Sequence, residues 1–209
     1  VDVEIKPQVG PVLSAPIRTR DDVERLLGCG FGQGTWVSHD GAAHQGAEGV
    51  AALRKAIALI LTELGTPAQA PKPGALQQGA SQQAQAQPTG WTPLIGFGGA
   101  PFTLAAYLVE GKPSRDHLAA RSLMHADPPT WDLLMRWCAQ VTGDFIALQI
   151  SCGASAAQLF DSWAGSLSPT DYRERVAPYS ALALDVARQA VSPTTGKAAP
   201  LIHFGTGTA

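Results

Sequence analysis

Three short apolar runs in the second half of the chain constrain its fold more than any other feature. They are PLIGF (93–97), AAQLFD (156–161) and PLIHFG (200–205). Helical patterns separate or follow them, over 102–111, 127–153 and 168–190. Strands that alternate with helices are typical of parallel βα units, so we predict an α/β fold with a parallel sheet. Strands covered on both faces need no apolar and polar alternation, which fits these runs.

Local signals mark the ends of the predicted helices. The helix over 127–153 has proline at its start and glycine at its end. For the helix over 168–190, Ser168 is the predicted N-cap and Pro169 takes the first helical position. Asp171 then lies in the first turn, where the helix dipole favours negative charge.

The first third of the chain carries weaker signals. Thr19 is the predicted N-cap of a short helix, because Asp21 and Asp22 follow it in the first turn. Residues 28–49 are rich in glycine and have no clear period, so we predict irregular structure there. They lead into a second predicted helix, which Gly65 ends.

Residues 66–90 differ in composition from everything around them. They consist almost entirely of Pro, Gln, Ala, Gly and Ser, with Lys72 as the only charge and Leu76 as the only large apolar side chain. Such a segment cannot offset its ordering entropy by burial, so we predict a flexible low-complexity insertion. A glutamine-rich interaction tract is the alternative interpretation.

Composition excludes several classes of function. The formal net charge is −2 and the basic residues are scattered, which predicts neither nucleic-acid binding nor membrane binding. No apolar run reaches the length of a membrane span. The three cysteines, Cys29, Cys138 and Cys152, lie far apart and outside any zinc-binding spacing, and the histidines also lack such spacing. We therefore expect no metal, no disulfide framework and a cytoplasmic location.

In parallel α/β folds, ligands meet the carboxyl ends of the strands. After the first strand, Gly98 and Gly99 permit close backbone approach, and Tyr107 follows one to two turns into the next helix. The same residues fit a purely structural role, in which the glycines make the turn and Tyr107 packs in the core. The GFGG run lacks the spacing of a nucleotide-binding fingerprint.

The second strand ends in LFDSWAG, where Asp161 and Ser162 point in alternate directions and Trp163 can wall a pocket. Ser162 has no nucleophile-elbow motif around it, so a hydrogen-bonding role is favoured over a catalytic one. His203, in the third strand, stays unassigned, because a single histidine near an apolar strand is usually a core residue.

Three longer runs resemble uroporphyrinogen decarboxylase, a family of haem-pathway enzymes. They are PLIGFGGAPFTLAAYLVEG, FDSWAGSLSPTDYRERVAPYS and PLIHFGTGT, in the family's order and approximate spacing. The opening segment, VDVEIKPQVGPVLSAPIRTRDDVERL, is also similar. The resemblance implies a (β/α)8 TIM barrel that converts uroporphyrinogen III to coproporphyrinogen III by removing four acetate carboxyls. It further implies no cofactor, and a homodimer at full length.

The resemblance also suggests substrate-binding residues. Tyr107 matches the tyrosine of the family's Y-x-V/I-E-G run, and Ser162 matches the serine of DSWAG, which binds a substrate carboxylate. Phe97 corresponds to an aromatic residue that lines the porphyrinogen cleft. Asp161 is interpreted as a brace for the loop.

Other family features are missing from residues 1–209: the R-x-x-G-R motif, the aspartate that gathers the pyrrole N–H groups, and a C-terminal histidine. Catalytic residues are therefore not assigned. We expect the chain to be an internal fragment with about three of eight barrel strands, inactive by itself. Two alternatives stay open, a corrinoid-linked methyltransferase of the same barrel superfamily and a non-catalytic interaction protein.

Overall fold

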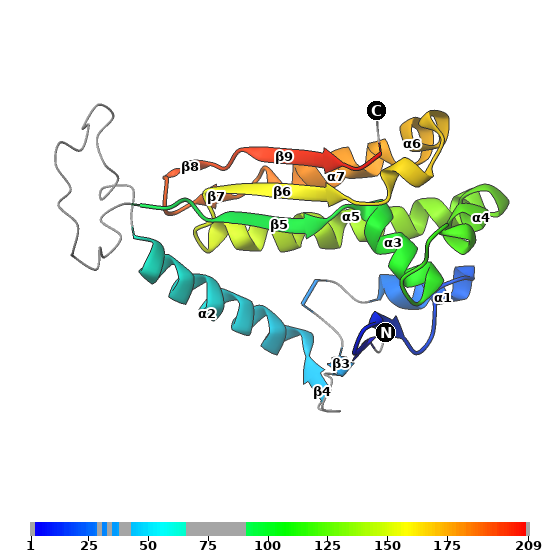
Figure 1. The fold of residues 1–209 in the computed structure, drawn as a ribbon, viewed down its shortest axis with the longest axis horizontal. Helices are drawn as coiled ribbons and strands as arrows, with labels where there is room; N and C mark the ends of the chain where they lie inside the picture. The colour runs from blue at the N-terminus through cyan, green and yellow to red at the C-terminus, as the bar shows by residue number, and fades with distance from the viewer. Residues whose placement is uncertain (1–2, 29–30, 33–34, 38–42, 66–90, 208–209) are drawn as a thin grey trace.

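A three-stranded parallel sheet forms the centre of the chain (Figure 1). We describe it from a computed structural model, over residues 3–28, 31–32, 35–37, 43–65 and 91–207. The strands are β5 (Ile95–Gly99), β6 (Ala156–Asp161) and β9 (Leu201–Gly205), in that spatial order. Their register pairs Gly99 with Phe160 and Phe160 with Phe204, so all three carboxyl ends meet at one edge. The predicted α/β fold with a parallel sheet is confirmed.

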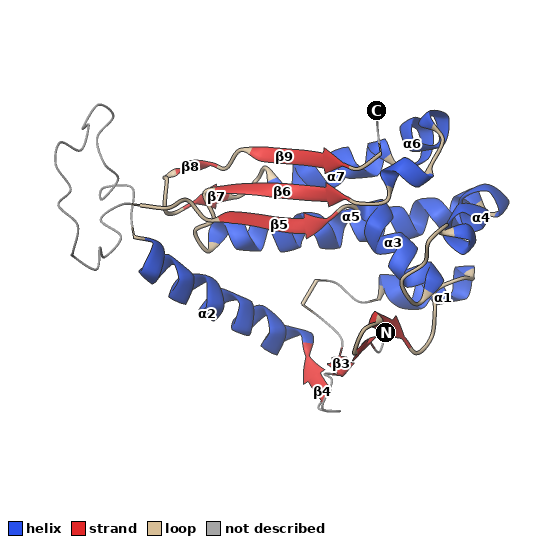
Figure 2. Ribbon diagram, in the orientation of Figure 1, coloured by secondary structure: helices blue, strands red, loops and turns tan. Residues whose placement is uncertain are grey.

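Helices cover one face of this sheet (Figure 2). The long α5 (Pro128–Ser151) and α7 (Ala177–Ala187) lie against each other behind the strands. Ile146, Ile150 and Leu159 form the core between the helices and the sheet. On the opposite face, Phe97 and Phe204 are exposed. The expectation that both faces are covered is thus wrong for the described residues, because every helix that packs on the sheet does so from the same side.

Glycines in β5 allow α5 to pack closely on the sheet. A Cβ on Gly96 would lie 3.1 Å from the Gln149 Cβ, and one on Gly98 would lie 3.1 Å from the Ile146 Cγ1. The interpretation that Gly98 leaves room for a ligand is therefore wrong, since Gly98 faces the helix. Gly99 points the other way, and a Cβ there would meet only the Thr103 side chain, at 3.6 Å.

The helices confirm most of the predicted boundaries. α3 (Pro101–Glu110) follows β5, and α5 begins after Asp127, whose side chain accepts a hydrogen bond from the Thr130 backbone N–H. The predicted helix over 168–190 is instead two helices, α6 (Pro169–Arg175) and α7. Pro178 accounts for the break, because proline lacks an N–H donor and clashes with the preceding turn. The Ser168 cap is confirmed, with its hydroxyl accepting from the Asp171 backbone N–H at 3.1 Å.

Smaller elements complete the second half of the chain. They are α4 (Leu118–Ala126), the 3-10 turn η2 (Ala164–Ser166), and the antiparallel pair β7 (Val191–Ser192) and β8 (Lys197–Ala198). The sequence patterns did not indicate α4. Glu110 explains where this helix begins, because its carboxylate accepts hydrogen bonds from the backbone N–H groups of Ala119 and Ala120, at 2.8 and 3.2 Å.

Two hairpins and two helices precede the sheet. The hairpins join β1 (Val3–Lys6) to β2 (Gly10–Leu13) and β3 (Thr35–Val37) to β4 (Ala43–Gln45), and the helices are α1 (Arg20–Leu27) and α2 (Gly46–Leu64). Thr19 caps α1 as predicted, and Gly65 follows α2 with φ of +78°. The prediction of irregular structure over 28–49 is wrong at β3 and β4, which pair through backbone hydrogen bonds that need no apolar period. It is also wrong over 46–49, where α2 has already begun.

One expectation concerns a segment that the structure does not test, and another concerns membrane spans. The low-complexity insertion at 66–90 lies outside the described residues. Within the described ranges, no helix combines the length and apolar character needed to span a membrane.

Candidate functional site

The polar candidates gather at the carboxyl edge of the sheet. Ser162 directly follows β6 and its side chain is exposed, while Tyr107 is half-buried on α3, which begins just after β5. Phe97 lies further from this edge, in the middle of β5, on the face of the sheet that no helix covers; we call this the open face. The parallel arrangement brings Tyr107 and Ser162 to the carboxyl edge of the sheet, although the chain separates them widely.

An aromatic row crosses the open face of the sheet. Phe97 contacts Phe160 with ring centroids 6.0 Å apart, and Phe160 contacts Phe204 at 5.8 Å, both edge to face. Phe97 is 62% exposed and Phe204 is 46% exposed. Edge-to-face packing holds such rings in defined positions, so the row offers an apolar surface to a flat partner.

The backbone of Phe97 is held from the helix side. The Gln149 side chain accepts a hydrogen bond from the Phe97 N–H at 3.1 Å and donates one to the Phe97 carbonyl at 2.8 Å. Thr142, on the same face of α5 and about two turns earlier, donates from its hydroxyl to the Gly99 carbonyl at 3.0 Å. These α5 side chains therefore fix the strand that carries Phe97.

Tyr107 contacts the segment that carries Ser162 through an aromatic ring. The Tyr107 phenol lies 4.6 Å from the Trp163 indole between centroids. The imidazole of His117 also packs on Trp163, with the ring centroids 4.3 Å apart. Because Trp163 is the neighbour of Ser162, this contact links the two predicted hydroxyl donors.

The loop after β6 rests directly on the loop after β9. The Thr206 hydroxyl donates to the Ser162 carbonyl, and the Gly165 N–H donates to the Thr206 carbonyl at 3.0 Å. A Cβ on Gly165 would lie 2.6 Å from that carbonyl oxygen and 2.7 Å from the Gly207 oxygen. Only glycine permits this approach, so Gly165 helps to determine where Ser162 lies.

Asp161 and His203 lie on the opposite, helix-covered side of the same edge. The Asp161 carboxylate is fully buried and its Oδ2 lies 3.7 Å from the His203 Nε2. That nitrogen is also 3.4 Å from the Tyr172 hydroxyl, on α6. Burial, and then the nearby Asp161 charge, raise the pKa of Tyr172 to about 12. Asp161 therefore lies away from the open face, and neither of its carboxylate oxygens has a hydrogen-bond partner among the described residues.

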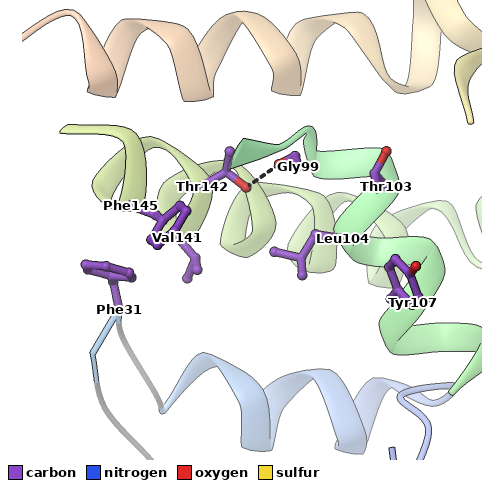
Figure 3. A pocket seen from close by; sticks show the side chains of 8 residues that line it. All are labelled: Phe31, Gly99, Thr103, Leu104, Tyr107, Val141, Thr142 and Phe145. Carbon is purple, nitrogen blue, oxygen red and sulfur yellow. Dashed lines mark hydrogen bonds between the residues drawn. The ribbon is translucent and has the colours of Figure 1, made fainter. Parts of the chain in front are cut away.

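A largely apolar pocket of about 300 Å³ lies next to α3 (Figure 3). Its lining residues are Phe31, Gly99, Thr103, Leu104, Tyr107, Val141, Thr142 and Phe145. Of the three predicted substrate-binding residues, Tyr107 alone lines it. Tyr107 thus lies between this pocket and the Trp163 ring.

Several residues of this region escaped sequence reasoning. His117 and Glu110 carry no pattern that indicates their partners, since their contacts depend on how α3 and α4 fold back. Gln149 could have been suspected, because a polar residue stands among apolar ones near the end of a buried helix. No cluster of three or more His, Cys, Asp or Glu side chains suited to a metal ion occurs in the described part of the chain.

Comparison with known proteins identifies relatives over the whole chain. The family described as uroporphyrinogen decarboxylase (URO-D) matches residues 78–209. A uroporphyrinogen decarboxylase of Arthrobacter sp. strain FB24 is 47% identical over 208 residues, which cover 100% of this chain and 46% of that protein. One from Leifsonia xyli is 43% identical over 217 residues, which cover 100% of this chain and 48% of that protein. A third, from Streptomyces griseus, is 42% identical, with 44% of its length covered. The chain thus spans about half the length of the curated relatives that it matches.

Proposed function

The chain belongs to the uroporphyrinogen decarboxylase family, and we propose from this membership that it contributes part of the active site of such an enzyme. The proposed reaction is the loss of four acetate carboxyls from uroporphyrinogen III as CO₂, which yields coproporphyrinogen III. The observation that supports this assignment is the placement of Tyr107 and Ser162 at one edge of a parallel sheet, joined through Trp163.

The residue types found here suit one part of this chemistry, the holding of carboxylates. Loss of CO₂ from a pyrrole acetate requires a protonated ring that can accept the electron pair, while the remaining carboxylates are held in place. The Tyr107 and Ser162 hydroxyls are neutral donors suited to hold carboxylates. The row formed by Phe97, Phe160 and Phe204 offers an apolar floor for the tetrapyrrole.

We propose that the sheet is one arc of a (β/α)8 barrel. Its strands follow one another in chain order, and the helices that pack on it lie on a single face (Figure 2). A doubly wound sheet would carry helices on both faces, whereas a barrel carries them only outside. The open face with Phe97 and Phe204 then corresponds to the barrel interior.

Activity is proposed for the full-length encoded protein, as a homodimer, and not for residues 1–209 alone. Three strands cannot close a barrel, because closure requires matched strand number, tilt and shear. Size-exclusion chromatography with light scattering tests the dimer. Turnover of uroporphyrinogen by the purified 209-residue chain would contradict the proposal that this part is inactive by itself.

The central experiment measures coproporphyrinogen formed from anaerobically prepared uroporphyrinogen III by the full-length protein. Loss of one carboxylate-holding hydroxyl, in Tyr107→Phe or Ser162→Ala, is expected to lower kcat/KM about tenfold or more. Tyr179→Phe is a matched control, because that hydroxyl donates to Asp132 between α7 and α5 and does not line the Tyr107 pocket. Absence of coproporphyrinogen with the unaltered full-length protein would refute the proposed function.

A further inference from the structure

His117 occupies an unusual position for a histidine. It is 2% exposed, and neither ring nitrogen has a hydrogen-bond partner among the described residues. Its backbone has φ of 49° and ψ of 39°, immediately before α4. Left-handed backbone is uncommon for a residue other than glycine, although histidine is among those that tolerate it. The fold therefore keeps an imidazole in a buried place where its polar atoms are not used.

The surroundings of His117 are aromatic. Trp163 packs on the imidazole at 4.3 Å with an interplanar angle of 33°, and Phe102 approaches edge to face at 6.3 Å. Phe102 is fully buried and contacts Trp131 at 6.2 Å, within the core. The imidazole thus lies between a rigid core ring and the Trp163 indole, and Trp163 in turn contacts Tyr107.

We propose that His117 is a positioning residue: its ring holds Trp163 against Tyr107, and so sets where the Tyr107 and Ser162 hydroxyls meet a carboxylated tetrapyrrole. This inference rests on the proposed function, since it assigns those two hydroxyls to the substrate. It extends that function to a residue with no direct ligand contact, placed behind the site.

The role depends on a neutral imidazole. A charged ring would be buried without a hydrogen-bond acceptor, which is costly, so protonation is expected to displace the ring and loosen Trp163. Burial lowers the pKa of His117, the neighbouring carboxylates of Glu110 and Asp116 oppose this shift, and Arg121 adds to it. Because Glu110 caps α4, its carboxylate is committed to backbone N–H groups and does not approach the imidazole as a partner. Substrate affinity is therefore expected to fall on the acid side of neutrality.

Two variants of the full-length protein distinguish the effect of the His117 ring itself from the effect of its protonation. His117→Phe keeps an aromatic ring that cannot be protonated, and His117→Asn tolerates the left-handed backbone but has no ring. Both retain Glu110, Asp116 and Arg121. His125→Phe is the matched control, because it removes a half-exposed histidine at the other end of α4, which contacts Asp171 at 3.1 Å.

The first measurement needs no substrate. In protein labelled with 5-fluorotryptophan, the Trp163 resonance is assigned by its loss in Trp163→Phe, and it is followed by fluorine NMR as the pH falls. We expect it to shift with pH in the unaltered protein and in His125→Phe, to stay constant in His117→Phe, and to be displaced at every pH in His117→Asn.

The second measurement is steady-state turnover of uroporphyrinogen III. We expect His117→Asn to raise KM about five- to tenfold with kcat almost unchanged, because loosened donors weaken the ground state and the transition state alike. His117→Phe should have the KM of the unaltered protein at neutral pH, without the rise of KM at acid pH. The role of His117 would be overturned if the unaltered protein, His117→Phe and His117→Asn had normal turnover, equal KM values and the same rise of KM at acid pH. The proposed function would then remain intact. Absence of turnover in the unaltered protein would instead refute the proposed function and, with it, this inference.

Discussion

Gln149 binds both backbone polar groups of Phe97, accepting from the N–H at 3.1 Å and donating to the carbonyl at 2.8 Å. The two residues lie on different elements, α5 and β5, and Gln149 is only 7% exposed. Gly96 makes the contact possible, because a Cβ there would lie 3.2 Å from the Gln149 side-chain oxygen. One buried amide thus ties the helix layer to the strand that carries a proposed substrate contact.

Replacing this amide should be costly. Gln149→Leu leaves the Phe97 N–H and carbonyl without their side-chain partner, so the free energy of unfolding is expected to fall by about 1–3 kcal/mol. Urea unfolding followed by circular dichroism measures the change. Gln140→Leu is the control, because Gln140 is exposed on the same helix, and its effect should stay within about 0.5 kcal/mol. Equal stabilities of the two variants would contradict the structural role of Gln149.

Gly165→Ala tests the contact between the two loops. The new Cβ would lie 2.6 Å from the Thr206 carbonyl oxygen, so the loop after β6 must move away from the loop after β9. We expect the full-length enzyme to lose affinity for uroporphyrinogen by about tenfold, since Ser162 moves with the loop. Gly28→Ala is the comparison, because it lies at the end of α1 and its Cβ would meet only the Arg25 carbonyl, at 3.5 Å. An unchanged KM in Gly165→Ala would show that the loop contact does not place Ser162.

The α1 capping box predicts a pH dependence of stability. Hydrogen bonds from the Arg18 and Thr19 backbone N–H groups and from the Thr19 hydroxyl lower the pKa of Asp22 to about 2. The folded-state pKa lies below the unfolded value of about 3.9, so the stabilisation is present above about pH 4 and is lost as the pH falls towards 2.

Asp22→Asn should therefore reduce stability by about 1 kcal/mol at neutral pH and very little near pH 2. Thermal unfolding over this pH range measures the difference. Asp21→Asn changes an exposed carboxylate of the same turn and is expected to alter stability by less than about 0.5 kcal/mol. A difference between the wild type and Asp22→Asn that persists at acid pH would refute this explanation.

The described cysteines should differ in reactivity. Cys138 is fully buried on α5, and this burial raises the pKa of its thiol, whereas Cys152 is only partly buried at the end of that helix. In a Cys29→Ser, Cys152→Ser variant, Cys138 should react with a maleimide only when the protein unfolds, because the thiolate is the nucleophile. Mass spectrometry with and without denaturant reports the result. Rapid labelling of the native variant would contradict the burial of α5.

Sequence patterns were sufficient where the signal is local. Thr19 and Ser168 cap their helices as predicted, because a side chain that accepts from a backbone N–H three residues ahead needs no tertiary partner. The break at Val176, just before Pro178, shows the limit of periodicity, since the apolar pattern continues through 168–190 while proline interrupts the backbone.

The sequence by itself determined the order of the three parallel strands and of the main helices around them, the caps at Thr19 and Ser168, and the family. Apolar runs, capping residues and long motifs are properties of contiguous residues. The sequence placed Tyr107 and Ser162 after strand ends, and parallel pairing brought them to one edge of the sheet. Only the tertiary structure decided that Gly98 faces a helix, that Asp161 points away from the open face, and that His117 packs on Trp163. These relationships depend on how α3, α4 and α5 pack against the sheet, and packing between distant segments leaves no periodic trace in the chain.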